Sequence, residues 1–169
     1  MISGLHRQIG KIHLWSNWAN HITEIFLFVI GLGMALIIGT QVFSRYVLNH
    51  SLFWSEEVGR ICLVWISFLG ASAAYKRRAH IGVDFLVARL PHNLRYAVAI
   101  LVLVLSLVFF GVLIVYGTIF AAFISGQKTA ALGLPLTLTY TAIPLSGALF
   151  SLHALSHLCK LIDPLEGSQ

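Results

Sequence analysis

The chain has 169 residues, of which 58% are hydrophobic and only 10% are charged. Soluble domains carry roughly a quarter charged residues, and one core of this size could not hide the apolar surface that a mean hydropathy of +0.87 implies. Eleven Lys and Arg against six Asp and Glu give a net charge of +5. The basic residues lie between the hydrophobic segments and do not form one soluble patch, so their distribution argues against nucleic-acid binding. It indicates the orientation of the chain in a membrane instead. The composition predicts an all-α integral membrane protein.

Four segments are apolar over the roughly twenty residues that are needed to cross a hydrocarbon core of about 30 Å. They cover residues 22–47, 55–75, 94–124 and 138–161. The third is longer than a perpendicular crossing needs, so we expect it to tilt or to extend beyond the bilayer. Pro144 lies within the fourth and predicts a kink or a loosened turn, because proline lacks a backbone donor and clashes with the preceding turn. Together the four segments predict a single membrane domain over residues 1–169.

The basic residues predict which side of the membrane holds the termini. With four crossings both termini share one side, and eight basic residues fall there: Arg7, Lys11, Lys76, Arg77, Arg78, Arg89, Arg95 and Lys160. Three fall on the opposite side: Arg45, Arg60 and Lys128. The positive-inside bias therefore places both termini in the cytoplasm, with the cluster of Lys76, Arg77 and Arg78 as the strongest orientation anchor.

Two further segments are amphipathic but too short to cross. Residues 1–20 carry apolar side chains at helical spacing among basic ones, and Trp15 and Trp18 follow, which predicts an interfacial helix. Residues 80–90, limited by Pro91, predict a short in-plane helix in the cytoplasmic loop. Within it, His80 and Asp84 are one turn apart, and we expect them to form a structural hydrogen-bonded pair on the cytoplasmic side.

Glu56, Glu57 and Arg60 form the most informative polar group, at the outer start of the second crossing after Trp54. One interpretation is an internally paired helix start, in which the carboxylates favour the positive end of the helix dipole and Arg60 lies one turn on. The other is an acidic surface patch or an intersubunit salt bridge that docks a partner. A proton relay is disfavoured, because it would need carboxylates deeper in the crossing.

His153 and His157 lie one turn apart on the fourth crossing, at a spacing that could ligate a metal or a haem. Two histidines on one helix cannot clamp a haem from both sides, so we favour interfacial histidines. The sequence contains no nucleotide loop, no metal-ligand cluster and no nucleophile with a base nearby. We therefore predict a protein that is not an enzyme and binds no cofactor. Small residues at Gly31, Ala35 and Gly39 predict a close helix contact, within this chain or with another.

Four stretches carry a resemblance to a known family. They are FSRYVLNHSLFWSEEVGR at residues 43–60, WISFLGASAAYKRRAHIGVD at 65–84, TAALGLP at 129–135 and YTAIP at 140–144. In this order and spacing they resemble the small membrane subunit, DctQ-like or SiaQ-like, of tripartite ATP-independent periplasmic (TRAP) transporters. The resemblance covers about residues 43–147. The residues that we expect to face a partner are Arg45, Trp54, Glu56, Glu57, Arg60 and Trp65.

The resemblance implies a sodium-driven uptake system of the bacterial inner membrane. A periplasmic protein captures the substrate, and a large membrane subunit, DctM-like or SiaM-like, carries the substrate and sodium sites and moves like an elevator. The small subunit resembles a scaffold that holds the immobile part of the large one, in contact with membrane lipids. The substrate is expected to be an organic acid such as a dicarboxylate, sialic acid, a keto acid or a sulfonate, and sodium is expected in the partner subunit.

Two alternatives belong to other classes of protein. A four-helix membrane cytochrome of the b type would carry electrons and would show a haem absorption band. A self-assembling small exporter would place an acidic residue near the centre of its first crossing. Glu24 is the only candidate for that residue, and it lies within the first few residues of the predicted crossing, on the cytoplasmic side.

Overall fold

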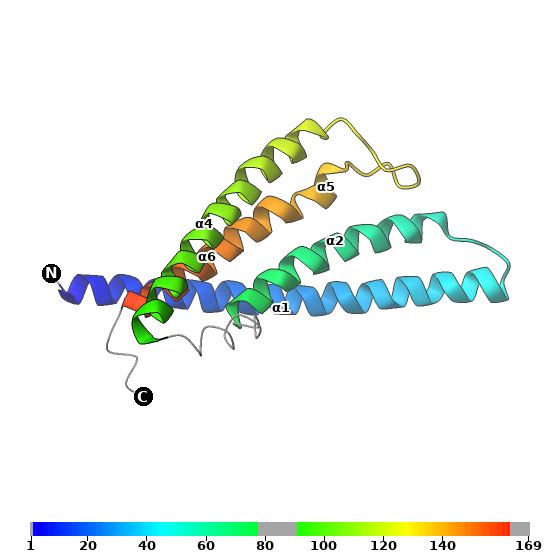
Figure 1. Ribbon diagram of the computed structural model, residues 1–169. Helices are drawn as coiled ribbons and strands as arrows, with labels where there is room; N and C mark the ends of the chain where they lie inside the picture. The colour runs from blue at the N-terminus through cyan, green and yellow to red at the C-terminus, as the bar shows by residue number, and fades with distance from the viewer. Residues whose placement is uncertain (1, 78–90, 163–169) are drawn as a thin grey trace.

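The computed structural model describes residues 2–77 and 91–162, and within these ranges the chain is helical apart from its turns, one loop and an isolated bridge. The helices are α1 (Ile2–Val47), α2 (Phe53–Lys76), α4 (His92–Phe123), α5 (Thr137–Tyr140) and α6 (Ala142–Ile162) (Figure 1). Four of the helical segments are long and apolar enough to cross a membrane. The predicted all-α membrane fold with four crossings is therefore confirmed.

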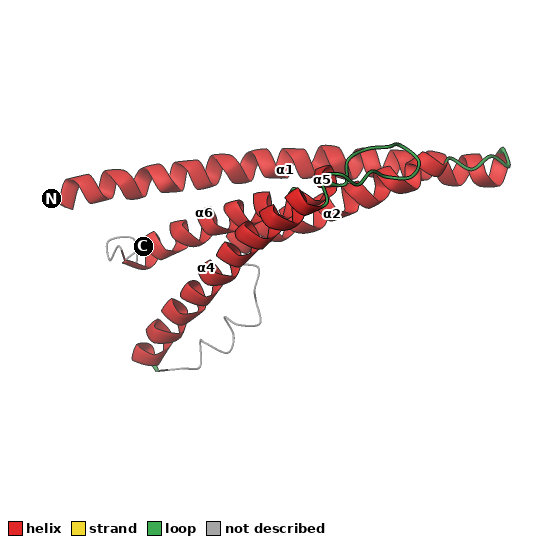
Figure 2. Ribbon diagram, turned by 90° about the horizontal axis from the view of Figure 1, so that it is seen from above, coloured by secondary structure: helices red, strands yellow, loops and turns green. Residues whose placement is uncertain are grey.

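The long helices form a spread array rather than a closed bundle. α1 packs along α2, α2 packs on α6, and α6 packs on α4, while α1 also contacts α6. Figures 1 and 2 show α1 and α4 at the two outer edges of this array. The start of α1 and the end of α6 lie at the same end of the array, which we call the terminal end (Figure 1). The loop between α4 and α5 and the turn between α1 and α2 lie at the opposite end, the loop end.

α1 differs from the prediction. No break separates the predicted interfacial helix over residues 1–20 from the predicted crossing over residues 22–47, because one helix of 46 residues runs from Ile2 to Val47. The interfacial position of residues 1–20 stays a prediction. At 1.5 Å per residue it is about 69 Å long, so it must extend well beyond a hydrocarbon core. Neither proline nor glycine stands between residues 11 and 30 to interrupt it. Trp15 and Trp18 contact each other edge to face on the exposed side of this helix.

Pro144 lies just after an interruption of the helical segment, as a proline in this place predicts. The segment that was expected to be one helix over 138–161 is divided into the single turn α5 and the helix α6, with the interruption at Thr141. Pro144 cannot donate to the carbonyl of Tyr140 and its ring crowds that carbonyl. It therefore stands in the first turn of α6, where a missing N–H costs little.

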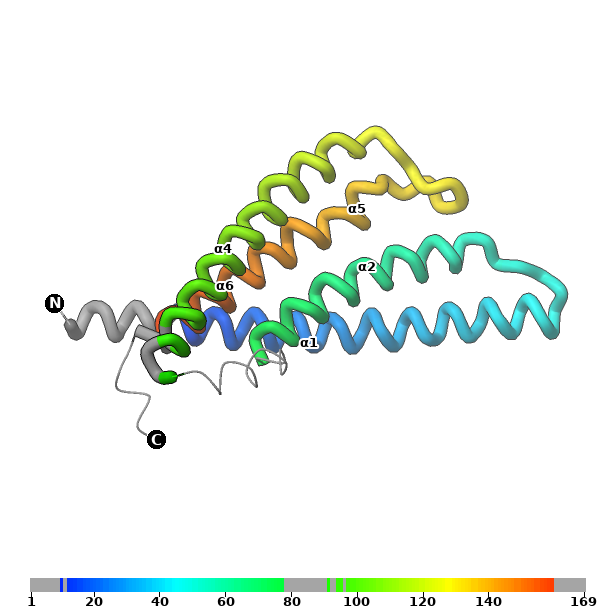
Figure 3. Tube along the Cα trace, in the orientation of Figure 1, coloured from blue at the N-terminus to red at the C-terminus, as the bar shows by residue number. Residues whose placement is uncertain are grey.

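α4 and α6 approach each other closely through two glycines. A Cβ atom on Gly117 would lie 2.9 Å from Ile143 Cγ2, and one on Gly147 would lie 3.0 Å from Ile114 Cγ1. Toward the terminal end of this contact, Phe110 and Phe150 stack with ring centroids 4.6 Å apart, and Tyr75 of α2 meets both rings edge to face. The paired traces of the two helices are followed most easily in Figure 3.

Most of the apolar surface of α1 and α4 is not covered by the other described residues of the chain. In the most apolar part of each helix, 6% of the residues are buried, against 33% in the span that includes α6. The exposed side chains on α4 are large, among them Leu101, Leu105, Val108, Phe109, Val112, Val115 and Phe123. Surfaces of this kind require lipid or another apolar protein surface as their neighbour.

Candidate functional site

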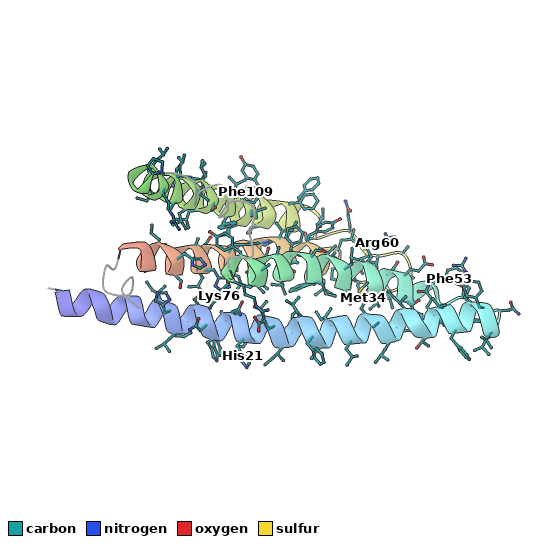
Figure 4. The ribbon with its side chains drawn as sticks, turned by 60° about the horizontal axis from the view of Figure 1, so that its bottom comes forward. His21, Met34, Phe53, Arg60, Lys76 and Phe109 are labelled. Carbon is teal, nitrogen blue, oxygen red and sulfur yellow. The ribbon has the colours of Figure 1, made fainter. Side chains whose placement is uncertain are left out.

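At the terminal end, a chain of hydrogen bonds joins three helices. Ser16 Oγ on α1 lies 2.9 Å from His153 Nδ1 on α6, and Lys76 Nζ on α2 donates to the same Ser16 oxygen over 3.0 Å. Ser16 and His153 are 0% and 1% exposed, so both bonds lie in the interior of the array. Figure 4 labels Lys76, which extends from α2 at this contact. The three residues tie α1, α2 and α6 together at one level.

A second set of contacts repeats this connection one turn away. Ser156 Oγ on α6 lies 2.8 Å from His13 Nδ1 on α1. The ring of His157 meets that of Tyr75 edge to face, with centroids 5.9 Å apart. His153 and His157, considered above as interfacial residues or metal ligands, therefore both make contacts between helices.

The orientation anchors also make contacts within the chain. Arg77 Nη2 donates to Glu24 Oε1 over 2.6 Å, and Asn20 donates to the same oxygen. Lys76 is engaged with Ser16, whereas Arg78 lies outside the described residues. His80, Asp84 and the predicted in-plane helix over 80–90 also lie outside the described residues.

At the loop end, Glu57 holds the connection between α4 and α5. Its Oε1 accepts the backbone N–H of Ala131 over 2.6 Å, and its Oε2 accepts that of Leu132 over 3.0 Å. Two carboxylate oxygens bound to two successive amides form charge-assisted hydrogen bonds of defined geometry. Glu57 thus fastens a loop 74 residues away to the first turns of α2.

Glu56 and Arg60 lie beside Glu57 but are used differently. Glu56 Oε1 accepts a hydrogen bond from the side chain of Gln41 on α1 over 3.2 Å. Arg60 is exposed, and among the described residues it forms an ion pair with neither glutamate. The internally paired helix start that the spacing suggested is therefore absent from this part of the chain, because loop amides and Gln41 occupy the carboxylates.

Of the other three residues that were expected to face a partner, two are exposed and one makes contacts inside the chain. Arg45 is exposed and Trp54 is 42% exposed, so both remain available at the loop end. Trp65 instead donates its Nε1–H to the carbonyl of Leu138 over 3.1 Å and meets Phe26 edge to face at 5.8 Å. Apart from the adjacent residues of α1 and its own backbone, no described atom lies within 4 Å of the position that a Cβ would take on Gly31 or Gly39.

Ser16 and His13 are not among the predicted site residues, and their partners are 137 and 143 positions away. A signal was present, because a polar residue recurs every three or four positions on one side of α1, at residues 13, 16, 20 and 23. The matching polar side chains of α6, residues 153, 156 and 157, show the same spacing. Neither pattern identifies which helix faces which.

Comparison with known proteins shows which family of membrane proteins has sequences like this one. The family described as the DctQ component of tripartite ATP-independent periplasmic transporters matches residues 34–163. The sialic acid TRAP transporter small permease protein SiaQ of Vibrio cholerae is 25% identical over 148 residues, which cover 88% of this chain and 86% of SiaQ. The C4-dicarboxylate small permease protein DctQ of the same organism is 32% identical over 67% of this chain and 51% of DctQ.

One similarity extends into a longer permease. The isethionate TRAP transporter permease protein DctMQ of Oleidesulfovibrio alaskensis is 29% identical over 141 residues, which cover 79% of this chain but 22% of that protein. A sequence like this one therefore occurs within the same polypeptide as a larger permease. The chain belongs to the DctQ component family of TRAP transporters: it is a multi-pass inner-membrane subunit that works with a large permease subunit and a substrate-binding protein, and it is not an enzyme.

Proposed function

We propose that this chain is the non-catalytic scaffold of a sodium-coupled transporter that imports an organic acid anion. In this role it holds the large elevator-type subunit in the membrane, while the substrate and sodium sites belong to that partner. The two proteins form a heterodimer to which a periplasmic substrate-binding protein delivers its cargo. This chain binds no cofactor of its own.

The observation that carries the proposal is the contrast between the outside and the inside of the helix array. The outer sides of α1 and α4 are apolar and uncovered, and such surfaces suit lateral contact with a large membrane protein and with lipids. The described polar side chains near the terminal end bind one another between helices instead of lining a path. An array of this kind can hold a partner without itself conducting a solute.

The substrate class rests on the names of the relatives. Those names state sialic acid for SiaQ, C4-dicarboxylate for DctQ and isethionate for DctMQ. All three are organic anions at neutral pH, and a fourth relative is named for ectoine, a zwitterion that also carries a carboxylate. An organic acid is therefore the substrate class that we propose for the complex containing this chain. The diversity of the three fits a scaffold whose residues do not select the cargo.

The same proposal orients the protein, with the terminal end in the cytoplasm and the loop end in the periplasm. The basic residues support this orientation, because eight of the eleven lie toward the terminal end by sequence. Single cysteines at Ser125 and Asn17, which are exposed residues at opposite ends, provide a test in a chain whose own Cys62 and Cys159 are replaced by serine. Under this orientation a membrane-impermeant maleimide labels Ser125→Cys in intact spheroplasts and labels Asn17→Cys only after lysis.

Reconstitution tests the function. The chain is co-expressed with its large subunit, purified as a complex, and placed in liposomes with an inward sodium gradient. Uptake of radiolabelled sialic acid, succinate and isethionate is then measured with the purified periplasmic binding protein added. We expect uptake of one organic acid that requires the binding protein, the gradient and both membrane subunits. Equal uptake by the large subunit alone would contradict the scaffold role, and uptake by this chain alone would assign transport to it.

A further inference from the structure

His153 on α6 is a histidine enclosed by the helix array. Only 1% of it is exposed, and it is the largest of the fully buried side chains in the described part of the chain. Nδ1 lies 2.9 Å from Ser16 Oγ, whereas Nε2 is buried without a hydrogen-bond partner among the described residues. A proton would make both ring nitrogens donors and would place a charged N–H where the described residues offer no acceptor. The surroundings of His153 therefore favour the neutral ring.

A proton on His153 would also meet positive charge. Lys76 Nζ donates to Ser16 Oγ over 3.0 Å, so a protonated His153 and the Lys76 ammonium group would share one hydroxyl oxygen. The two cationic nitrogens could then be no farther apart than the two bond lengths combined. His157, one turn further along α6, is a second basic neighbour. Because like charges repel strongly where water is excluded, these neighbours disfavour the charged ring.

The described residues place no negative charge where it could balance a proton on His153. They contain three carboxylates, at positions 24, 56 and 57. The last two belong to the first turns of α2, at the loop end. Glu24 lies about 12 Å beyond Ser16 along α1, and its oxygen is bound by Arg77 and Asn20. A charged His153 would therefore have no counter-ion among these groups.

The helices around His153 supply only basic, neutral or apolar side chains at this position. The described titratable groups are His13 on α1, Tyr75 and Lys76 on α2, and His157 on α6. α4, which packs on α6, contributes the apolar side chains of Leu103, Leu107 and Phe110 to the adjoining core. Protonation of His153 thus conflicts with every described helix that surrounds it.

We propose that His153 is a proton-binding site that controls the contact between α1 and α6. While the ring is neutral, the bonds from Ser16 to His153 and from His13 to Ser156 hold these two helices together. Uptake of a proton separates them, because a charge without a counter-ion is more stable in water than between packed helices. The contact lies at the terminal end, which the proposed function assigns to the cytoplasm. Acid on that side therefore loosens α1, which forms one outer edge of the array (Figure 1).

Helix separation at two pH values tests the proposal on the full chain in mixed micelles. Dyes on Asn17→Cys of α1 and Leu155→Cys of α6, two exposed positions, report the separation by energy transfer, in a chain whose Cys62 and Cys159 are replaced by serine. A histidine in water has a pKa of about 6.5. Because only the separated form takes up a proton at His153, the equilibrium constant for separation is expected to rise by up to about thirtyfold from about pH 7.5 to about pH 5.

Two variants assign this rise to a residue. His153→Asn keeps an amide group near the position of Nδ1 but cannot be protonated, so its pH response should lack the factor of about thirty. The matched control is His21→Asn, the same change on an exposed histidine of α1 at the same end. It should keep the wild-type response within about threefold. If His153→Asn does not fold, His153→Gln takes its place.

Each result has a defined meaning. A rise that is missing only when His153 is replaced supports the proposal. A wild-type constant that does not rise on acidification would overturn it, whatever the variants do. An equal rise in His153→Asn, or loss of the rise in His21→Asn, would show that another group takes up the proton. Both ends of the protein share one pH in micelles, so a negative result leaves the proposed scaffold role and its orientation untouched.

Discussion

The hydroxyl group of Ser16 on α1 bonds to Nδ1 of His153 on α6, across 137 positions of sequence. Lys76 donates to the same hydroxyl oxygen, because an ammonium group can only donate. The Ser16 hydroxyl can both donate and accept, and its role in the bond to His153 Nδ1 follows from the tautomer of the histidine. The three side chains meet only with all three helices in their observed places.

Replacing Ser16 tests this chain of bonds. Ser16→Ala leaves buried His153 Nδ1 without its hydrogen-bond partner and removes one acceptor from Lys76, so the free energy of unfolding is expected to fall by about 1–3 kcal/mol. Equilibrium unfolding in mixed micelles measures the change. Ser67→Ala is the matched control, because Ser67 is exposed on α2 and should change stability by less than about 0.5 kcal/mol. If the two variants are equally stable, the Ser16 bond does not hold the helices together.

Replacing Glu24 distinguishes a scaffold from an exporter that works alone, because only the exporter needs a carboxylate in its first crossing. Its carboxylate is bound by Arg77 and Asn20, and the side chains of Glu24 and Arg77 are 32% and 67% exposed. An ion pair this exposed contributes at most about 1 kcal/mol. We expect Glu24→Gln to assemble with the large subunit and to support uptake at the wild-type rate in proteoliposomes. Loss of uptake in a correctly assembled complex would instead give Glu24 a part in transport.

Glu57 should determine the order of the loop of residues 125–136 between α4 and α5. In Glu57→Ala the N–H groups of Ala131 and Leu132 lose their acceptors, and hydrogen exchange of these two amides is expected to become faster. Glu56→Ala is the control, because Glu56 bonds to Gln41 and not to the loop. Mass spectrometry of the 125–136 segment gives both rates. Unchanged protection in Glu57→Ala would show that the bonds within the loop are sufficient.

Gly117 allows α4 and α6 to approach each other. A Cβ atom there would lie 3.0 Å from Pro144 Cδ and 3.2 Å from its backbone nitrogen. A proline ring cannot rotate away, so Gly117→Ala forces the helices apart and is expected to cost about 1–3 kcal/mol. Thermal unfolding in detergent compares it with Gly111→Ala on the same helix, where nothing lies within 4 Å of the added atom.

At Gly111 the substitution should be neutral or stabilising by up to about 1 kcal/mol, because alanine favours helix. The opposite order of the two variants would show that α4 and α6 do not meet as described.

Hydropathy and helical period are properties of single segments, and they identified the four crossings and the interruption near Pro144. The motifs at residues 43–60 and 65–84 are sufficient by themselves to indicate the family. The sequence misled where a boundary depended on context. Mixed polarity over residues 1–20 suggested a separate helix, yet no residue there breaks the backbone, and α1 continues through it.

The partners of the polar residues were decided by tertiary structure alone. Glu56, Glu57 and Arg60 have a spacing that permits an ion pair, but the pairing depends on which segment packs beside α2, and loop amides 74 and 75 positions away occupy Glu57. Ser16 likewise meets His153 only because α1 and α6 are rotated toward each other. The free energy of burying a helix in lipid depends on its own composition, whereas a hydrogen bond between helices depends on their relative rotation and register, which no single segment encodes.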